Sequence, residues 1–181
     1  MKTILMQSTI SEASVSELMT LCEQAVAAGE TEIRIIIASD GGDIRQAFRG
    51  FYFLSTLPVV LHTHNCGYVD SAAVLLFLAG TVRSATAEAI FFLHPLECTF
   101  ETSTTISHDQ MRNILIRLDS DYQRITSLFQ ARTLDHNSSV KWPDVLNSLS
   151  AIDAELALQY GLIDIIKVYL PEQQDILGVI I

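Results

Sequence analysis

Three short apolar runs in the first half of the chain each lead into a residue type that carries chemistry at the end of a strand. They are residues 35–37 before Gly41 and Gly42, residues 59–61 at the start of the strand expected before Ser71, and residues 91–93 before His94. Apolar runs of this length, bounded by glycine, serine or proline, are typical of buried β-strands. Since the ends of parallel strands meet at one edge of a sheet, we expect the Gly-Gly pair, the serine and the histidine to face one crevice.

Between these runs, apolar residues recur at helical spacing. We expect strands at residues 3–6, 33–38, 59–64, 89–93 and 163–169, a first helix that ends at Gly29, and helices at 43–55, 71–79, 107–133, 143–147 and 153–160. Thr9 and Ser14 each begin a capping-box pattern with Glu12 and Glu17, which predicts where the first helix starts. The alternation predicts an α/β fold with a mostly parallel sheet and right-handed crossovers.

The composition limits the function classes that remain. A chain of 181 residues is long enough to bury the core of one domain. Its apolar fraction of 49% and mean hydropathy of +0.33 are high for a soluble monomer, so we expect part of its surface to close against other subunits. The net charge of −10 argues against nucleic acid or an anionic membrane as a partner, because both require clustered Lys and Arg.

The N-terminal segment and the cysteines indicate a compartment. The segment becomes polar at Gln7, which is too early for a secretory signal, and no apolar stretch reaches the roughly 20 residues that span a bilayer. Cys22, Cys66 and Cys98 lack the spacing of a disulfide framework and indicate free thiols. We therefore expect a cytoplasmic protein.

Four motifs, in this order, resemble the proteolytic subunits of the Clp protease (ClpP-like, peptidase family S14) within the crotonase-like superfamily. They are S-D-G-G at 39–42, G-Y-V-D-S-A-A at 67–73, F-L-H-P at 92–95 and Y-G-L-I-D at 160–164. The resemblance implies a ClpP/crotonase-like fold of repeated β-β-α/β-α-β units with a protruding handle helix. It implies one domain over 1–181, with a core at about 1–95, the handle at 97–135, and the C-terminal helices and last strand at 140–181.

By this resemblance, Ser71 is the nucleophile, His94 is its general base, and the N–H groups of Gly42 and Ala72 form the oxyanion hole. The residues alone leave simpler interpretations open. A serine is preferred as a helix N-cap, Gly-Gly is common in strand-to-helix turns, and a histidine at a strand end is often a core residue. Asp70 departs from the small residue that the family has there. A carboxylate beside the nucleophile disfavours an oxyanion unless its side chain turns to solvent, and Asp70 is itself a candidate N-cap.

The third residue of the family's triad, an aspartate that orients the histidine, has no match. Its place falls on Leu149, and Asn147 and Asp144 are the nearby side chains that can accept a hydrogen bond from histidine Nδ1–H. Loss of the orienting residue costs on the order of 10⁴ in kcat, so an inactive protein is a serious alternative.

No metal or cofactor is expected. His62, His64 and Cys66 alternate along one strand, but side chains on the same face of a strand lie nearly 7 Å apart. We interpret them as a packed, partly polar strand face.

The sequence therefore predicts a serine endopeptidase that cleaves peptides or unfolded proteins through an acyl-enzyme and assembles into a ring or stacked rings through the handle. A catalytically impaired structural or regulatory subunit is the alternative. A crotonase-type acyl-CoA enzyme is a third, disfavoured because no basic cluster suited to the CoA phosphates is visible. The chain lacks the longer N-terminal segment that helps to dock the family's unfolding ATPase, which leaves an ATPase partner open.

Overall fold

The computed structural model describes residues 1–98, 100, 105–134 and 139–181. Its strands are β1 (Lys2–Met6), β2 (Glu32–Ser39), β3 (Val60–Asp70), β4 (Val82–Ala85), β5 (Ile90–Leu93), β6 (Ser150–Asp153), β7 (Ile165–Ile166) and β8 (Ile176–Ile180). Its helices are α1 (Glu12–Ala27), α2 (Ile44–Ser55), α3 (Ala73–Phe77), α4 (His108–Thr133), α5 (Trp142–Leu146) and α6 (Ala154–Gln159), with a 3-10 turn η1 (Gln173–Asp175). Most of the polar segment expected at 97–105 lies outside the described residues.

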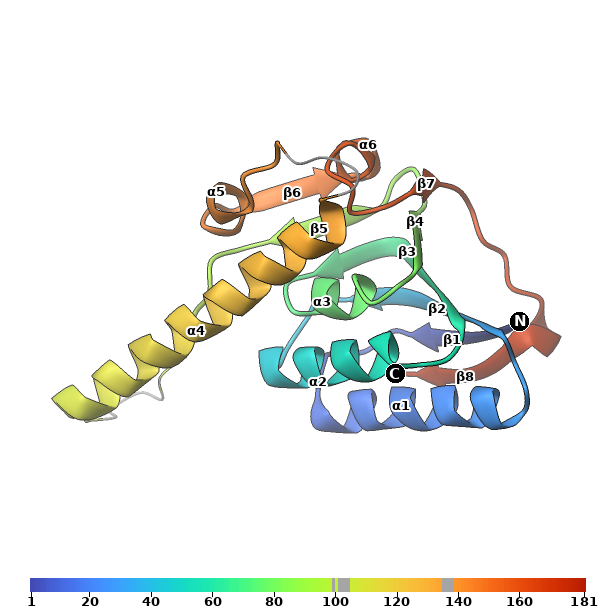
Figure 1. The fold of residues 1–181 in the computed structure, drawn as a ribbon, viewed down its shortest axis with the longest axis horizontal. Coiled ribbons are helices and arrows are strands. Elements are labelled where there is room, and N and C mark those ends of the chain that lie inside the picture. The colour runs from blue at the N-terminus through green and yellow to red at the C-terminus, as the bar shows by residue number, and fades with distance from the viewer. Residues whose placement is uncertain (99, 101–104, 135–138) are drawn as a thin grey trace.

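In the described residues, eight strands form one sheet in the order β6-β5-β3-β2-β1-β8, with β4 and β7 branching from β3 (Figure 1). All pairings are parallel except that of β5 with β6. The prediction of an α/β fold with a mostly parallel sheet is confirmed. The order places β3 between β2 and β5, so the end of β3 is flanked by the ends of the two strands that precede Gly41 and His94.

The helices α1, α2 and α3 cover one face of the sheet (Figure 1). Alternate residues of β2 point toward them, and Ile33, Ile35 and Ile37 are buried, as the period of two along a strand requires. All five residues of α3 are buried, which puts this short helix inside the core rather than on its surface.

The start of α1 differs from the expectation. Ser11, rather than Thr9 or Ser14, is the N-cap, because its side chain accepts the N–H of Ser14 while Ser14 Oγ accepts the N–H of Ser11. Ile10 pairs with Gly42 in a parallel bridge, which holds the chain extended up to the cap. The C-terminal end is as predicted, with Gly29 in the left-handed region at φ +84°.

Several elements differ in length or were not anticipated. The strand expected at 59–64 continues to Asp70, and the helix expected at 71–79 is only α3. The strand expected at 163–169 reduces to β7, while β4, β6 and β8 were not predicted. β4, β6 and β7 have four residues or fewer, so their hydrophobic alternation is too brief to recognise.

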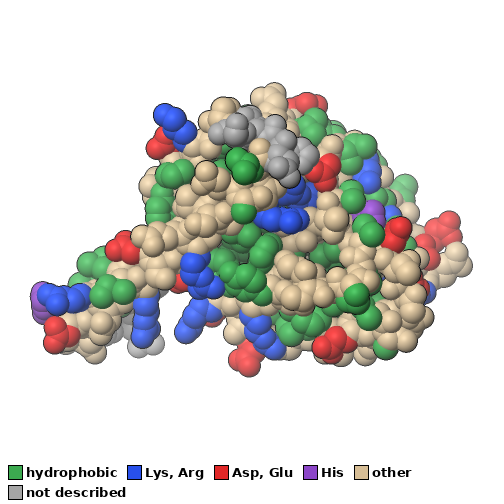
Figure 2. Space-filling model, in the orientation of Figure 1, with side chains coloured by type: hydrophobic (Ala, Val, Ile, Leu, Met, Phe, Trp, Pro, Cys, Tyr) green, Lys and Arg blue, Asp and Glu red, His purple; other side chains and the backbone are tan. Residues whose placement is uncertain are grey.

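Helix α4 extends away from the body as an arm (Figure 1). It begins at a capping box of Ser107 and Gln110, and its last turns are buried at Ile125 and Phe129. Trp142 packs against Phe129 with ring centroids 4.7 Å apart and fixes the base of the arm. Figure 2 shows hydrophobic side chains both between α4 and the body and along the outer part of the arm, where Met111, Leu115 and Ile116 are exposed. The long helix predicted at 107–133 is confirmed.

No helix among the described residues combines the length and apolarity needed to cross a bilayer.

Candidate active site

Ser71 lies in a strained turn between β3 and α3. Its φ of +51° is the only positive φ among the described residues other than glycine. A side chain in the left-handed region costs about 1 to 2 kcal/mol, so the surrounding contacts must impose this conformation. Ser71 N–H donates to Phe92 O on β5 at 2.8 Å, and Val74 N–H donates to Ser71 O at 3.1 Å. The backbone is thus held at both ends of the turn.

The Ser71 side chain does not cap the helix. The N-cap of α3 is Ala72, which has no side-chain hydrogen bond, and the Ser71 hydroxyl has no hydrogen-bond partner in the part of the chain that the structure describes. The strained backbone therefore serves to present a free hydroxyl rather than to start α3.

The Gly41–Gly42 turn packs directly against Ser71. A Cβ atom at Gly41 would lie 2.7 Å from Asp70 O, 2.8 Å from Ser71 Cβ and 3.0 Å from Ala72 N. Gly41 has φ +92° and Gly42 φ +145°, so both the close approach and the backbone conformation favour glycine. Residue 10 fixes the turn, because Ile10 N–H donates to Gly41 O and Ile10 O accepts from Asp43 N–H.

Two backbone amides at this point are free to bind a ligand. The N–H groups of Gly42 and Ala72 have no acceptor among the described residues. Buried or partly buried backbone donors are paired in the great majority of cases. Two unpaired donors beside an unpaired hydroxyl form an arrangement suited to an oxygen that carries negative charge.

His94 follows β5 and borders the same pocket as Ser71 and Ala72. Its Nδ1 lies 2.8 Å from Pro95 O. Because a carbonyl can only accept, this contact places the proton on Nδ1 and leaves Nε2 as a proton acceptor. Nε2 makes no hydrogen bond to Ser71 in this structure, so the two side chains share a pocket without being paired.

The pocket that Ser71 and His94 border has apolar walls. These come from the start of α2, from α3, from the end of β5 and from the bases of α4 and α5, and the side chains are Ile44, Leu75, Leu93, Leu96, Tyr122, Ile125, Phe129 and Leu146. Figure 2 shows hydrophobic side chains gathered on this face between α4 and the body. A pocket lined in this way is suited to an apolar group.

Asn147 and Asp144 do not contact His94. Asn147 Nδ2 donates to Tyr122 Oη at 2.9 Å, and the Tyr122 hydroxyl donates to Pro143 O at 3.2 Å. Asp144 borders a different surface pocket. Leu149, which occupies the place of the family's aspartate, is 73% exposed. Among the described residues, the hydrogen bond that orients His94 is the one to Pro95 O.

Asp70 turns toward β5 rather than into solvent or onto α3. Its Oδ1 accepts the N–H of Phe92 at 3.1 Å. Burial raises the pKa of the Asp70 carboxyl and the charge of Asp40 adds to this, while the Phe92 N–H and the charge of His94 act in the opposite direction.

A second serine–histidine pair lies outside this pocket. His64 Nδ1 and Ser84 Oγ are 3.0 Å apart, but both side chains are buried at 1% and 2% exposure. Burial, with smaller contributions from Lys167 and Arg34, lowers the pKa of His64 to about 4. The pair is shielded from any substrate, and we interpret it as structural.

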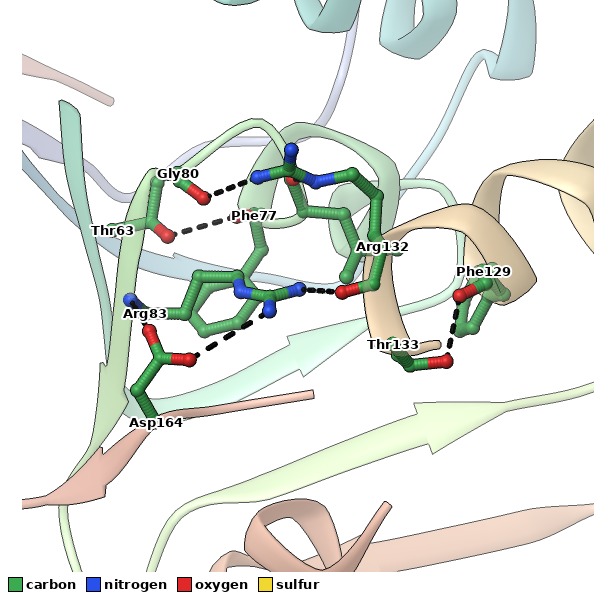
Figure 3. A network of polar contacts seen from close by, with 9 residues as sticks. Thr63, Phe77, Gly80, Arg83, Phe129, Arg132, Thr133 and Asp164 are labelled. Carbon is green, nitrogen blue, oxygen red and sulfur yellow. Dashed lines mark hydrogen bonds and ion pairs between the residues drawn. The ribbon is translucent and has the colours of Figure 1, made fainter. Parts of the chain in front are cut away.

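The far end of α3 is held by the base of α4. Arg132 Nε donates to Leu78 O at 2.8 Å and its Nη2 to Gly80 O at 2.6 Å, as Figure 3 shows for Gly80. Arg83 Nη1 in turn donates to Arg132 O at 2.9 Å, and Asp164 binds Arg83. This arginine network fixes the helix whose start bears Ser71. Sequence reasoning missed it, and the basic residue in the last turn of α4 was the only signal.

An α/β sheet whose strand ends bring Gly-Gly, a strained serine and a histidine around an apolar pocket has the layout of a serine hydrolase. The family model described as Clp protease matches residues 2–169, and the chain belongs to the Clp protease family. A search of the curated proteins finds no match.

Proposed function

We propose that this protein is a serine peptidase that cleaves peptides or unfolded proteins, with Ser71 as nucleophile and His94 as general base. The observation that carries the proposal is the free Ser71 hydroxyl, which a strained turn presents into the pocket that His94 borders. His94 Nε2 takes the hydroxyl proton as Ser71 Oγ attacks the peptide carbonyl carbon. His94 then returns the proton to the leaving amine, and water releases the acyl-enzyme by the same steps.

The free N–H groups of Gly42 and Ala72 support the proposal, because the carbonyl oxygen gains a negative charge as the tetrahedral intermediate forms. Removal of one such donor typically costs 10² to 10³ in kcat. The apolar lining of the pocket supports a preference for an apolar side chain on the acyl side of the bond.

We further propose that the protein assembles with copies of itself through α4. Met111, Leu115 and Ile116 are exposed on the arm, and apolar side chains grouped in this way usually meet another subunit. The free thiols of Cys22, Cys66 and Cys98 are compatible with the cytoplasm.

A catalytically impaired subunit is the second candidate. It is favoured by the unpaired Ser71 and His94 and by the lack, in the described residues, of a carboxylate hydrogen-bonded to His94. Catalytic hydrogen bonds are often long or absent until substrate binds, so the active enzyme remains our first proposal.

Hydrolysis of fluorogenic peptides with Leu, Phe, Asp or Lys before the reporter group tests the proposal. We expect cleavage after Leu and Phe that falls to background in Ser71→Ala and by at least 10³-fold in His94→Ala. Ser120→Ala, at an exposed serine on α4, is the matched control and retains full activity. Well-folded protein that cleaves none of the peptides would favour the impaired subunit.

A further inference from the structure

The aspartate of a catalytic triad has two separate functions. It orients the histidine through Nδ1–H, and its negative charge stabilises the imidazolium that forms in the transition state. In this protein the Pro95 carbonyl orients the histidine, with its oxygen 2.8 Å from His94 Nδ1. A carbonyl has no net charge, so another group must stabilise the imidazolium.

Asp70 is the carboxylate that the sheet places beside His94. Asp70 on β3 pairs with Phe92 on β5, and His94 follows Phe92 by two residues. Adjacent strands lie about 4.8 Å apart and two residues along a strand span about 6.6 Å, so the backbone of His94, one residue beyond β5, lies about 8 Å from that of Asp70. The hydrogen bond from Phe92 N–H to Asp70 Oδ1, at 3.1 Å, holds the carboxylate on the side of β3 that faces β5.

This placement separates the Asp70 carboxylate from the oxyanion hole. Gly41 approaches Asp70 at its backbone carbonyl, from the β2 side of β3, whereas the carboxylate turns toward β5 on the other side. The charged groups that act on Asp70 are Asp40, which is exposed and therefore screened, and His94. A half-buried carboxylate is screened less and interacts more strongly with a nearby imidazolium.

We propose that two groups share the functions of the missing triad aspartate. The Pro95 carbonyl orients His94, and the Asp70 carboxylate stabilises the protonated form of His94. The inference rests on the proposed function. As the bond from Ser71 Oγ to the carbonyl carbon forms, the hydroxyl proton moves to His94 Nε2 and the carbonyl π electrons move to its oxygen. Asp70 stays ionised throughout and exchanges no proton.

The variant Asp70→Asn isolates the charge, because asparagine keeps the oxygen that accepts from Phe92 N–H. Glu97→Gln is the matched control, since Glu97 is an exposed carboxylate three residues after His94. Asp70→Glu is the conservative variant, because it keeps the negative charge. We expect Asp70→Glu to retain more of the reactivity of Ser71 than Asp70→Asn does, and Glu97→Gln to leave that reactivity unchanged.

The readout is the rate at which a fluorophosphonate labels Ser71 at pH 7, which should fall about 3- to 30-fold in Asp70→Asn, as the interaction of two charges about 8 Å apart implies. An unchanged labelling rate in Asp70→Asn would overturn the inference and leave Ser71 as the proposed nucleophile. A higher labelling rate in Asp70→Asn would also overturn it, because the carboxylate would then act mainly against the oxyanion. Absence of labelling in the unmodified protein would remove the proposed function, and the inference with it.

Discussion

Gly41→Ala tests whether the Gly-Gly turn is shaped by its contact with the turn at Ser71. Gly41 has φ +92°, and an added Cβ would meet Asp70 O at 2.7 Å and Ala72 N at 3.0 Å. Gly29 is a matched control, because its φ is +84° and a Cβ there would have nothing within 4 Å. The two substitutions share the backbone strain and differ in the clash.

The expected losses in the free energy of unfolding follow from the backbone strain and from the clash. Gly29→Ala destabilises the folded protein by about 1 to 2 kcal/mol through the left-handed conformation. It also stabilises it by about 0.4 to 1 kcal/mol, because the unfolded chain is less flexible. Its net cost in the free energy of unfolding is therefore about 1 kcal/mol. Gly41→Ala adds about 1 to 3 kcal/mol of overpacking against backbone atoms, for a total of about 2 to 4 kcal/mol. The turn at Ser71 must also shift by several tenths of an ångström.

Urea unfolding followed by circular dichroism measures the stability difference, and fluorophosphonate labelling measures the site. We expect Gly29→Ala to label at the rate of the unmodified protein and Gly41→Ala to label at least 10-fold more slowly, since misplacement by 1 Å costs about 10². Equal stability losses and equal labelling rates in the two variants would refute the close approach of Gly41 to Ser71.

Four further predictions concern stability, assembly and the orienting residue. Because the pKa of His64 is lowered to about 4, its contribution to stability is complete above pH 6.5 and is lost as pH falls toward 4, by up to about 3 kcal/mol; urea unfolding from pH 7 to 4 should show this slope, and His64→Gln should flatten it. Arg132→Gln should cost about 2 to 4 kcal/mol in urea unfolding, because Leu78 O and Gly80 O lose a charged donor. Leu115→Asp should lower the mass of the assembly measured by light scattering, and a clean monomer before mutation would contradict assembly through α4. Asn147→Ala and Asp144→Ala should each leave the labelling rate within about twofold, since neither side chain contacts His94; a large fall in either would identify the orienting residue.

The strand ends were predictable because hydrophobic periodicity reports burial. The apolar run before His94 ends where β5 ends, the run before Gly41 ends two residues before the end of β2, and α4 follows its apolar stripe closely. β8 also carries such a run, at residues 176–180, and was missed although its signal is present. β6 could not be found, since four mixed residues on a sheet edge acquire strand geometry only by pairing with β5.

The chemistry of the site was predictable only in part. Residue types at the strand ends indicated Ser71, His94 and the glycine turn, but no local pattern indicates the φ of +51° at Ser71, which the contact with β5 imposes. The role of Pro95 O is invisible in sequence because every residue has a carbonyl group. In the sequence, the Asp70 carboxylate is expected to disfavour an oxyanion beside it. The structure shows, through the register of β3 with β5 and the hydrogen bond from Phe92 N–H, that this carboxylate turns toward the strand that leads to His94.

The most direct test of the account is the position of a covalent fluorophosphonate adduct. Ser71 lies in the open pocket that His94 borders, and Ser84 is buried against His64. Tandem mass spectrometry of the labelled protein should place one adduct on Ser71, and Ser71→Ala should carry none. An adduct on Ser84 or on another serine, or labelling that persists in Ser71→Ala, would contradict the assignment of Ser71 as the nucleophile.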